Sequence, residues 1–191
     1  KSYEEQLKRV RDMVARMGQM ARGVKTPMIA DADTGYGGLL NVRHTVLGYE
    51  AAGISGIQLE DQEMPKKCGH TPGRRVIPAE EMVLKIKVAA EARRSRDFLI
   101  VARTDSRTTL GLEEAIRRGR MFGEAGADIV FIESPESEEE MRAIGKAIRR
   151  TWMKYAMRGV GGADNHARLD LAYQVADPWH MDSPTEQARF A

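Results

Sequence analysis

Apolar residues recur with the period of a helix over the first part of the chain. Steps of three and four residues place one apolar face on a helix over residues 2–24. That face is formed by Leu7, Val10, Val14, Met17, Ala21 and Val24. A short apolar run at 27–31 follows and predicts a buried strand entered from a turn at Pro27.

The helix–strand pattern then recurs along the chain. Gly53 and Gly126 are expected to end helices in a left-handed conformation, and Pro78 is expected to open one. Ser137 and Glu140 have the spacing of a capping box. The elements expected after the first strand are a helix over 41–52, a strand over 56–60, a helix from 78, a strand over 98–102, a helix over 112–125, a strand over 128–133 and a helix reaching residue 148.

Regular alternation of strands and helices limits the architecture to a (β/α) barrel or an open parallel sheet. Residues 50–60 and 123–133 resemble each other at an offset of 73, as two βα units of either architecture would. Acidic or basic residues follow each of the four strands, which favours the catalytic face of a TIM-type (β/α)8 barrel. No GxGxxG phosphate loop follows any strand, as an open dinucleotide-binding sheet would require.

Four clear strands are half of what a closed barrel needs. We therefore predict an α/β chain that is a partial TIM-type barrel. Residues 1–148 are expected to form the barrel segment with the catalytic motifs, and residues 149–191 an atypical C-terminal tail.

Acidic residues at the strand ends are the candidate metal ligands. Strand alternation would point Asp31 and Asp33 the same way. With Glu60 and Glu133 from other strands they would form an all-oxygen environment suited to Mg²⁺. The alternative is that Asp and the glycines at 35–38 simply end a strand.

Cys68 is the only cysteine of the chain, so no internal disulfide can form and a reducing compartment is expected. Lys66, Lys67 and His70 surround it, and nearby positive charge lowers the pKa of a thiol. Such a thiol suits proton transfer at a carbon centre. A covalent nucleophile, an incidental surface thiol and a zinc ligand are the less supported alternatives.

Arg103 ends a buried strand, where a guanidinium can hold a substrate carboxylate with two hydrogen bonds. The alternative is an internal ion pair with Asp105 or Glu133. His44 is expected to be a packed or surface side chain, and no role can be argued for His166 or His180.

Composition excludes several classes of protein. Hydrophobic residues make up 42% and charged residues 30% of the 191, which excludes global disorder. The formal charge of +2 predicts no nucleic-acid partner. No run approaches the roughly 18 apolar residues of a membrane span, so we expect no membrane partner. The expected location is the cytoplasm, with the mitochondrion as the alternative.

Five motifs together identify a family. DADTGYGG (31–38), GIQLEDQ (56–62), KKCGH (66–70), VARTD (101–105) and FIESP (131–135) resemble the isocitrate lyase/phosphoenolpyruvate mutase superfamily over residues 1–148. KKCGH is specific, because the mutase branch lacks this cysteine. The resemblance therefore favours the carbon–carbon lyases, and the compact loop after Gln62 is closer to the methylisocitrate and dimethylmalate types.

The resemblance also implies residue roles. Asp31, Asp33, Glu60 and Glu133 would surround Mg²⁺, or Mn²⁺ in its place. Arg103 would act at the substrate carboxylate, both in binding and in catalysis. Cys68 would donate a proton to the carbanion of the product. Lys66, Gly69 and His70 would shape the loop over the site, with Lys66 and His70 counted as catalytic and Gly69 and His70 as substrate-binding.

The implied reaction is cleavage of a 2-hydroxy di- or tricarboxylate of the methylisocitrate, dimethylmalate or isocitrate type to a 2-oxo acid and a carboxylate. The family habit predicts a homo-oligomer, either a dimer or a tetramer. The family's first two strands and a strand after residue 150 have no counterpart in this sequence. Alternatives are an incomplete barrel acting only as an oligomeric or binding unit, and a hydrolase or mutase of the oxaloacetate or phosphonopyruvate type.

Overall fold

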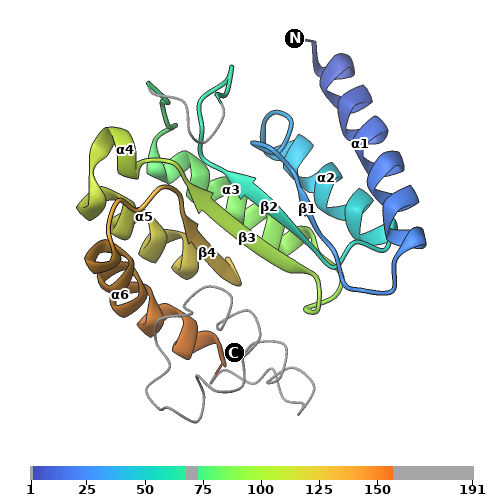
Figure 1. The fold of residues 1–191 in the computed structure, drawn as a ribbon. Coiled ribbons are helices and arrows are strands. Elements are labelled where there is room, and N and C mark those ends of the chain that lie inside the picture. Colours follow the sequence, from blue (N-terminus) through green and yellow to red (C-terminus); the bar gives the residue numbers. More distant parts are fainter. Residues whose placement is uncertain (1, 68–72, 157–191) are drawn as a thin grey trace.

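The structure is a computed structural model that describes residues 2–67 and 73–156, apart from the side chains of 149–156. Helices and strands alternate through it, as the hydrophobic pattern predicts (Figure 1). The elements are α1 (Tyr3–Gly23), β1 (Ile29–Asp31), α2 (Leu39–Ala51), β2 (Gly56–Glu60), α3 (Ala79–Ala92), β3 (Leu99–Thr104), α4 (Arg107–Leu110), α5 (Leu112–Ala125), β4 (Ile129–Ile132) and α6 (Glu138–Ala156).

The four strands form one parallel sheet in the order β1-β2-β3-β4. Each strand therefore pairs with its neighbour in sequence, as in a barrel, and the order does not reverse as it does in a doubly wound sheet. The predicted fold class and the four strands are confirmed. All four carboxyl ends lie at the same edge of the sheet.

Element boundaries follow local chemistry. Gly126 ends α5 with a φ of 115°, the left-handed conformation expected there. The backbone N–H of Glu140 donates to Ser137 Oγ at 3.2 Å, but the Glu140 carboxylate accepts from the N–H of Glu136, so only half of the predicted capping box forms. The short α4 was not predicted. The predicted boundary at residue 148 falls inside α6, and the division of the chain into two regions remains a prediction.

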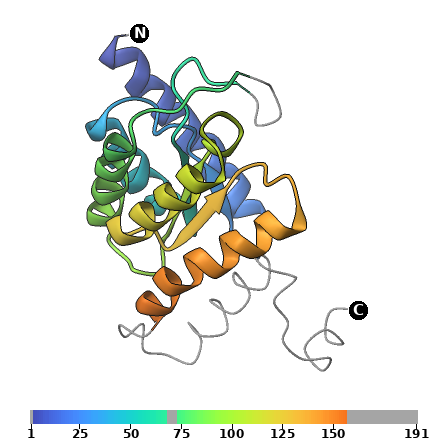
Figure 2. The same cartoon turned by 90° about the vertical axis from the view of Figure 1, so that its left-hand side faces the viewer.

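One face of the sheet is buried under helices. Figure 2 shows this layering from the side, and α2, α3 and α5 contact the strands. Alternate strand residues point into the core they form and are 3% exposed or less, namely Ala30, Ile57, Leu59, Ile100 and Ala102. This apolar burial is the main source of stability for the layered structure.

The opposite face of the sheet carries the other set of strand residues. Ile29 and Phe131 lie there and are 51% and 40% exposed. The strand register places Asp31, Glu60 and Arg103 on this same face, toward the carboxyl ends. Apolar side chains therefore line the open face, and charged ones gather at its rim.

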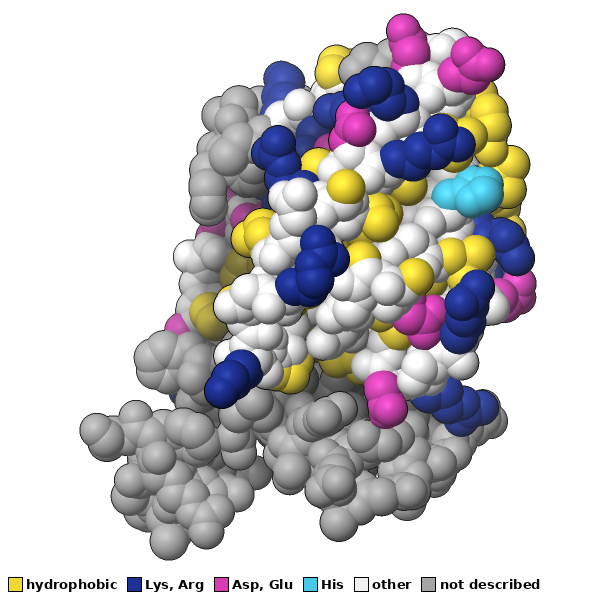
Figure 3. All heavy atoms as spheres, turned by 90° about the vertical axis from the view of Figure 1, so that its right-hand side faces the viewer, with side chains coloured by type: hydrophobic (Ala, Val, Ile, Leu, Met, Phe, Trp, Pro, Cys, Tyr) yellow, Lys and Arg dark blue, Asp and Glu magenta, His cyan; other side chains and the backbone are white. Residues whose placement is uncertain are grey.

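The outer surface over α1 and α2 shows basic and apolar side chains intermixed, with no one kind gathered (Figure 3). His44 is exposed on α2, consistent with the surface role expected for it. None of the helices in the described part of the chain combines the length and apolar character that a membrane crossing needs.

A buried polar network ties the β2–α3 connection to β3 and α5. Asp61 is fully buried, and its carboxylate accepts hydrogen bonds from Thr104 Oγ1, the Asp105 N–H and Arg118 Nη1 at 2.7, 2.9 and 2.9 Å. Burial raises the pKa of Asp61, and the bonds from Asp105, Thr104 and Arg118 oppose that shift. These hydrogen bonds compensate the negative charge of the Asp61 carboxylate, which has no contact with water.

Arg74 extends this network from the end of the same connection. It is 4% exposed and donates to Asp105 Oδ1 at 2.6 Å and to Thr108 Oγ1 at 2.9 Å. Asp105 is itself 0% exposed and also accepts two hydrogen bonds from Arg103. Arg74 and Arg103 thus share one buried carboxylate, so Arg74 helps to set the position of Arg103.

The substitution Arg74→Met should lower the free energy of unfolding by about 3 kcal/mol, because a buried ion pair loses one partner. Arg75→Met is the matched control. The Arg75 side chain is 73% exposed and pairs with Glu63, so its loss should cost less than about 1 kcal/mol. Urea unfolding of both variants measures the difference, and equal losses would contradict a structural role for Arg74.

Candidate active site at the carboxyl ends of the strands

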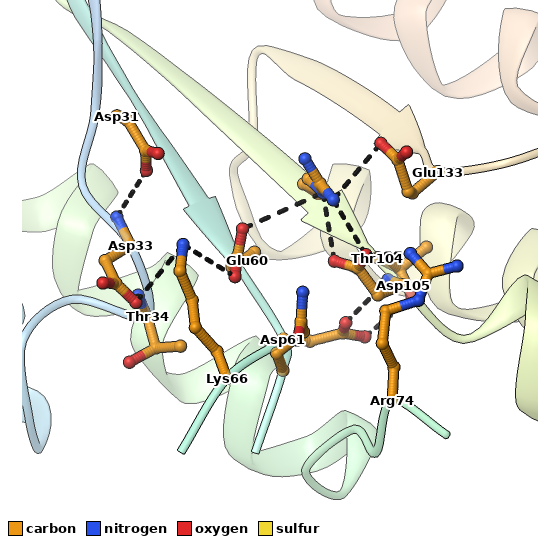
Figure 4. A network of polar contacts seen from close by, with 12 residues as sticks. Asp31, Asp33, Thr34, Glu60, Asp61, Lys66, Arg74, Thr104, Asp105 and Glu133 are labelled. Atoms are coloured by element: carbon orange, nitrogen blue, oxygen red, sulfur yellow. Dashed lines mark hydrogen bonds and ion pairs between the residues drawn. The ribbon is translucent and has the colours of Figure 1, made fainter. Parts of the chain in front are cut away.

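Charged side chains from all four strands meet at one edge of the sheet (Figure 4). Asp31 ends β1, Glu60 ends β2, Arg103 lies near the end of β3, and Glu133 follows β4 directly. Parallel strands present their carboxyl ends at a common edge, so residues far apart in sequence become neighbours there. This edge of the sheet corresponds to the face at which TIM-type barrels carry their active sites.

Asp31 and Asp33 lie differently from what strand alternation implies. β1 ends at Asp31, and Asp33 has a φ of 54°, outside the extended region. The Asp33 N–H donates to Asp31 Oδ1 at 2.7 Å, and the Thr34 N–H donates to Asp33 Oδ1 at 2.8 Å. The two carboxylates are therefore set by a tight turn and not by the pleat of the strand. Strand alternation therefore does not predict the direction of the Asp33 side chain.

The turn between β1 and α2 is fixed by close packing. Gly35 has a φ of +89°, and a Cβ there would lie 2.4 Å from Val42 Cγ2, so only glycine fits without displacement. The hydroxyls of Tyr36 and Tyr49 each donate to the carbonyl oxygen of Asp31 at 3.3 Å. Burial raises the pKa of both phenols, which keeps them neutral donors at this end of β1.

Glu60 is the most buried of the four candidate metal ligands, at 3% exposed. Its Oε1 lies 3.2 Å from Lys66 Nζ, and the same ammonium lies 3.6 Å from Asp33 Oδ1. Burial raises the pKa of Glu60, and the charge of Lys66 opposes that shift. Oε1 is buried and makes this ion pair without a hydrogen bond of good geometry.

Arg103 occupies the other side of Glu60. It donates to Asp105 through Nε and Nη2 at 3.0 and 2.8 Å, and its Nη2 lies 3.3 Å from Glu133 Oε2. Its Nε lies 3.9 Å from Glu60 Oε2, and its guanidinium sits 5.6 Å from the centre of the Phe131 ring. The internal ion pairs considered as the alternative for Arg103 are present. A substrate contact remains a prediction.

Three predicted residues, Cys68, Gly69 and His70, lie outside the described residues. Lys66, from the same motif, is described and contacts the carboxylates. The stems of this connection are joined by the antiparallel bridge between Gln62 and Val76. The connection therefore leaves and returns at the edge where the charged side chains meet.

Sequence reasoning places Asp61 among the charged residues that follow the strands but gives it no role, and it misses Arg74. Asp61 stands directly after Glu60, so the sequence offered the signal of a carboxylate at a strand end. It could not show which of two adjacent acids faces the core. Arg74 carries no pattern that separates it from its exposed neighbour Arg75.

The donor chemistry of the site fits a hard divalent cation. Asp31, Asp33, Glu60 and Glu133 supply only oxygen, and with Lys66 and Arg103 they leave a formal excess of two negative charges. As they stand, no three His, Cys, Asp or Glu side chains among residues 2–67 and 73–156 are grouped closely enough to hold a metal. The two cations lie between the carboxylates instead.

Comparison with known proteins agrees with this geometry. A family model described as phosphoenolpyruvate phosphomutase matches residues 3–171. The chain is 57% identical to the 2,3-dimethylmalate lyase of Eubacterium barkeri over 137 residues, which are 72% of this chain and 47% of that protein. The chain thus spans about half the length of the curated relatives it matches.

Solved structures share the fold at this level of coverage. A crystal structure of 2,3-dimethylmalate lyase gives a TM-score of 0.69 at 38% identity, over 72% of this chain and 46% of that one. Phosphonopyruvate hydrolase in complex with oxalate and Mg²⁺ gives 0.61 at 40% identity, over 70% and 46%. Because the family model matches most of the chain and the solved structures share its fold, the chain belongs to the phosphoenolpyruvate mutase/isocitrate lyase superfamily.

Proposed function

We propose that this chain carries the metal and carboxylate-binding half of a Mg²⁺-dependent carbon–carbon lyase. The substrate would be a 2-hydroxy di- or tricarboxylate, and the products a 2-oxo acid and a carboxylate. The observation that supports this most is the meeting of Asp33, Glu60, Arg103 and Glu133 at one edge of the sheet. A relative with 57% identity that is named a 2,3-dimethylmalate lyase supports the same class.

The metal would be held by Asp31, Asp33, Glu60 and Glu133, directly or through water. A divalent cation there would stabilise negative charge as it develops on substrate oxygens. The Mg²⁺ and oxalate bound together in phosphonopyruvate hydrolase, a structural relative, support this choice of cation. Mn²⁺ would serve as a substitute because it accepts the same oxygen ligands.

Arg103 would bind a substrate carboxylate. Asp105 holds its Nε and Nη2 through two hydrogen bonds. A guanidinium fixed in this way loses little freedom when it binds an anion. Phe131 below the guanidinium restricts its movement further.

Cys68 would return a proton to carbon. The 2-hydroxyl would lose its proton to solvent water as the adjacent carbon–carbon bond breaks, and the electron pair of that bond would pass to the carbon beside the released carboxylate. The Cys68 thiol would then protonate this carbon, and the resulting thiolate would regain a proton from solvent. Lys66, Gly69 and His70 would shape the loop that presents the thiol.

Release of oxo acid tests this function. The protein is supplied with 2,3-dimethylmalate, 2-methylisocitrate and isocitrate, with and without Mg²⁺. We expect oxo acid from at least one substrate, only with Mg²⁺. Cys68→Ser should lower the rate by about 10²–10⁴-fold, the usual contribution of a positioned acid. His44→Gln, on the exposed face of α2, is the control and should leave the rate unchanged.

A folded, metal-loaded protein that releases no oxo acid from any of the three substrates would contradict the lyase proposal. Turnover of phosphonopyruvate or oxaloacetate that Cys68→Ser leaves unchanged would support the hydrolase or mutase alternative. Circular dichroism of each variant separates a lost activity from a lost fold.

The open face of the sheet favours a second function, self-association. Ile29 and Phe131 are 51% and 40% exposed on that face, beside partly buried Leu99 and Ile129. We propose that copies of the chain associate through this face as a homo-oligomer, because exposed apolar patches and strand edges promote association.

Sedimentation equilibrium tests this association. We expect the wild type to be a dimer or tetramer. Phe131→Asp should weaken the association, because the charge of the introduced aspartate would have to be buried in the interface. Leu84→Asp, at an exposed position of α3, is the control and should not change the mass. A monomer at all concentrations with one cooperative melting transition would contradict the proposal.

A further inference from the structure

The ammonium group of Lys66 lies between two candidate metal ligands, where a bound metal ion would be expected. Its Nζ is 3.2 Å from Glu60 Oε1 and 3.6 Å from Asp33 Oδ1, and Figure 4 shows the ammonium between the two carboxylates. The side chain is 30% exposed, so it reaches the site from the solvent side. Lys66 belongs to the connection between β2 and α3 and is not held by a regular element.

The ammonium and a divalent ion cannot both use these oxygens as the structure places them. Mg²⁺ needs to lie about 2.1 Å from each ligand oxygen. Glu60 Oε1 is buried, so the ion would approach it from the open side, where Lys66 Nζ lies. Two positive charges at such short separation repel strongly, because the buried carboxylate lies where water screens little.

Arg103 does not have the same freedom to leave. Asp105 binds it through two hydrogen bonds, whereas the ion pairs of Lys66 among the described residues join it to the two candidate ligands. Lys66 is therefore the cation whose displacement costs least. It is also the one whose removal opens both Asp33 and Glu60.

We propose that Lys66 is an internal counter-cation that competes with the divalent metal for Asp33 and Glu60. This inference rests on the metal site of the proposed function. In the metal-free protein Lys66 compensates the buried charge of Glu60, and metal binding releases its ammonium. Because such coupling is reciprocal, the factor by which Lys66 weakens metal binding is the factor by which metal weakens the ion pairs of Lys66.

The metal affinity of variants at Lys66 tests the competition. Binding of Mn²⁺ is measured by electron paramagnetic resonance at low ionic strength for the wild type, Lys66→Met and Lys66→Arg. We expect Lys66→Met to bind about tenfold more tightly, within the range usual for coupled sites. Lys66→Arg keeps the charge and should stay close to the wild type.

Lys87→Met is the matched control. It removes the same charge from an exposed position of α3 and should leave the affinity within about twofold, because exposed charges at a distance are screened. Glu60→Gln should weaken binding and so locates the ion at this site. An affinity of Lys66→Met equal to or lower than that of the wild type would overturn the inference.

Labelling of the wild type gives a second readout that needs no folded variant. We expect Mg²⁺ to raise the rate of acetylation at Lys66, measured by mass spectrometry, and to leave that at Lys87 unchanged. An unchanged rate at Lys66 with bound metal would overturn the competition alone. Failure of the wild type to bind Mn²⁺ or Mg²⁺ at all would overturn the proposed metal site, and the competition with it.

Discussion

The structure depends on compensating acidic charge where the four parallel strands end. Six carboxylates gather there, and two of them, Asp61 and Asp105, are fully buried. A buried carboxylate without a partner is strongly destabilising, so each requires a cation or several hydrogen bonds. Arg118 and Arg74 satisfy the deeper pair, and Lys66 and Arg103 contact the outer ones.

The two layers of this charge network differ in what they can do. The inner layer is enclosed, and its two carboxylates are paired with Arg118 and Arg74, so it suits the fixing of β3, α5 and the β2–α3 connection. The outer layer opens to solvent and has an excess of negative charge, so it can exchange a cation. Lys66 and Arg103 belong to the outer layer, and the inner one helps to position Arg103 through Asp105.

Much of the fold could be predicted from periodicity alone. β2 and α5 have the predicted bounds, because Gly53 and Gly126 mark helix ends clearly and β2 is a continuous run. α4 could not be predicted, since four residues after Ser106 carry no helical period. α6 reaches Ala156, eight residues past the predicted end, because residues 149–156 contain no Gly or Pro that would end a helix.

The sequence predicts which charged residues gather at the strand ends, but not how they pair. Strand ends placed Asp31, Glu60, Arg103 and Glu133 at one edge. The turn that sets Asp33 depends on a positive φ, which strand alternation cannot show. The partners of Lys66 and Arg74 depend on the path of a long connection, and no sequence period encodes that path.

The strand-end carboxylates are proposed to form one divalent-cation site. Anomalous diffraction from crystals of the protein soaked in Mn²⁺ would locate that ion. We expect a single strong peak between the carboxylates of Asp33 and Glu60, with Lys66 moved away from both. A peak elsewhere, or no peak while Lys66 keeps both ion pairs in saturating Mn²⁺, would contradict it.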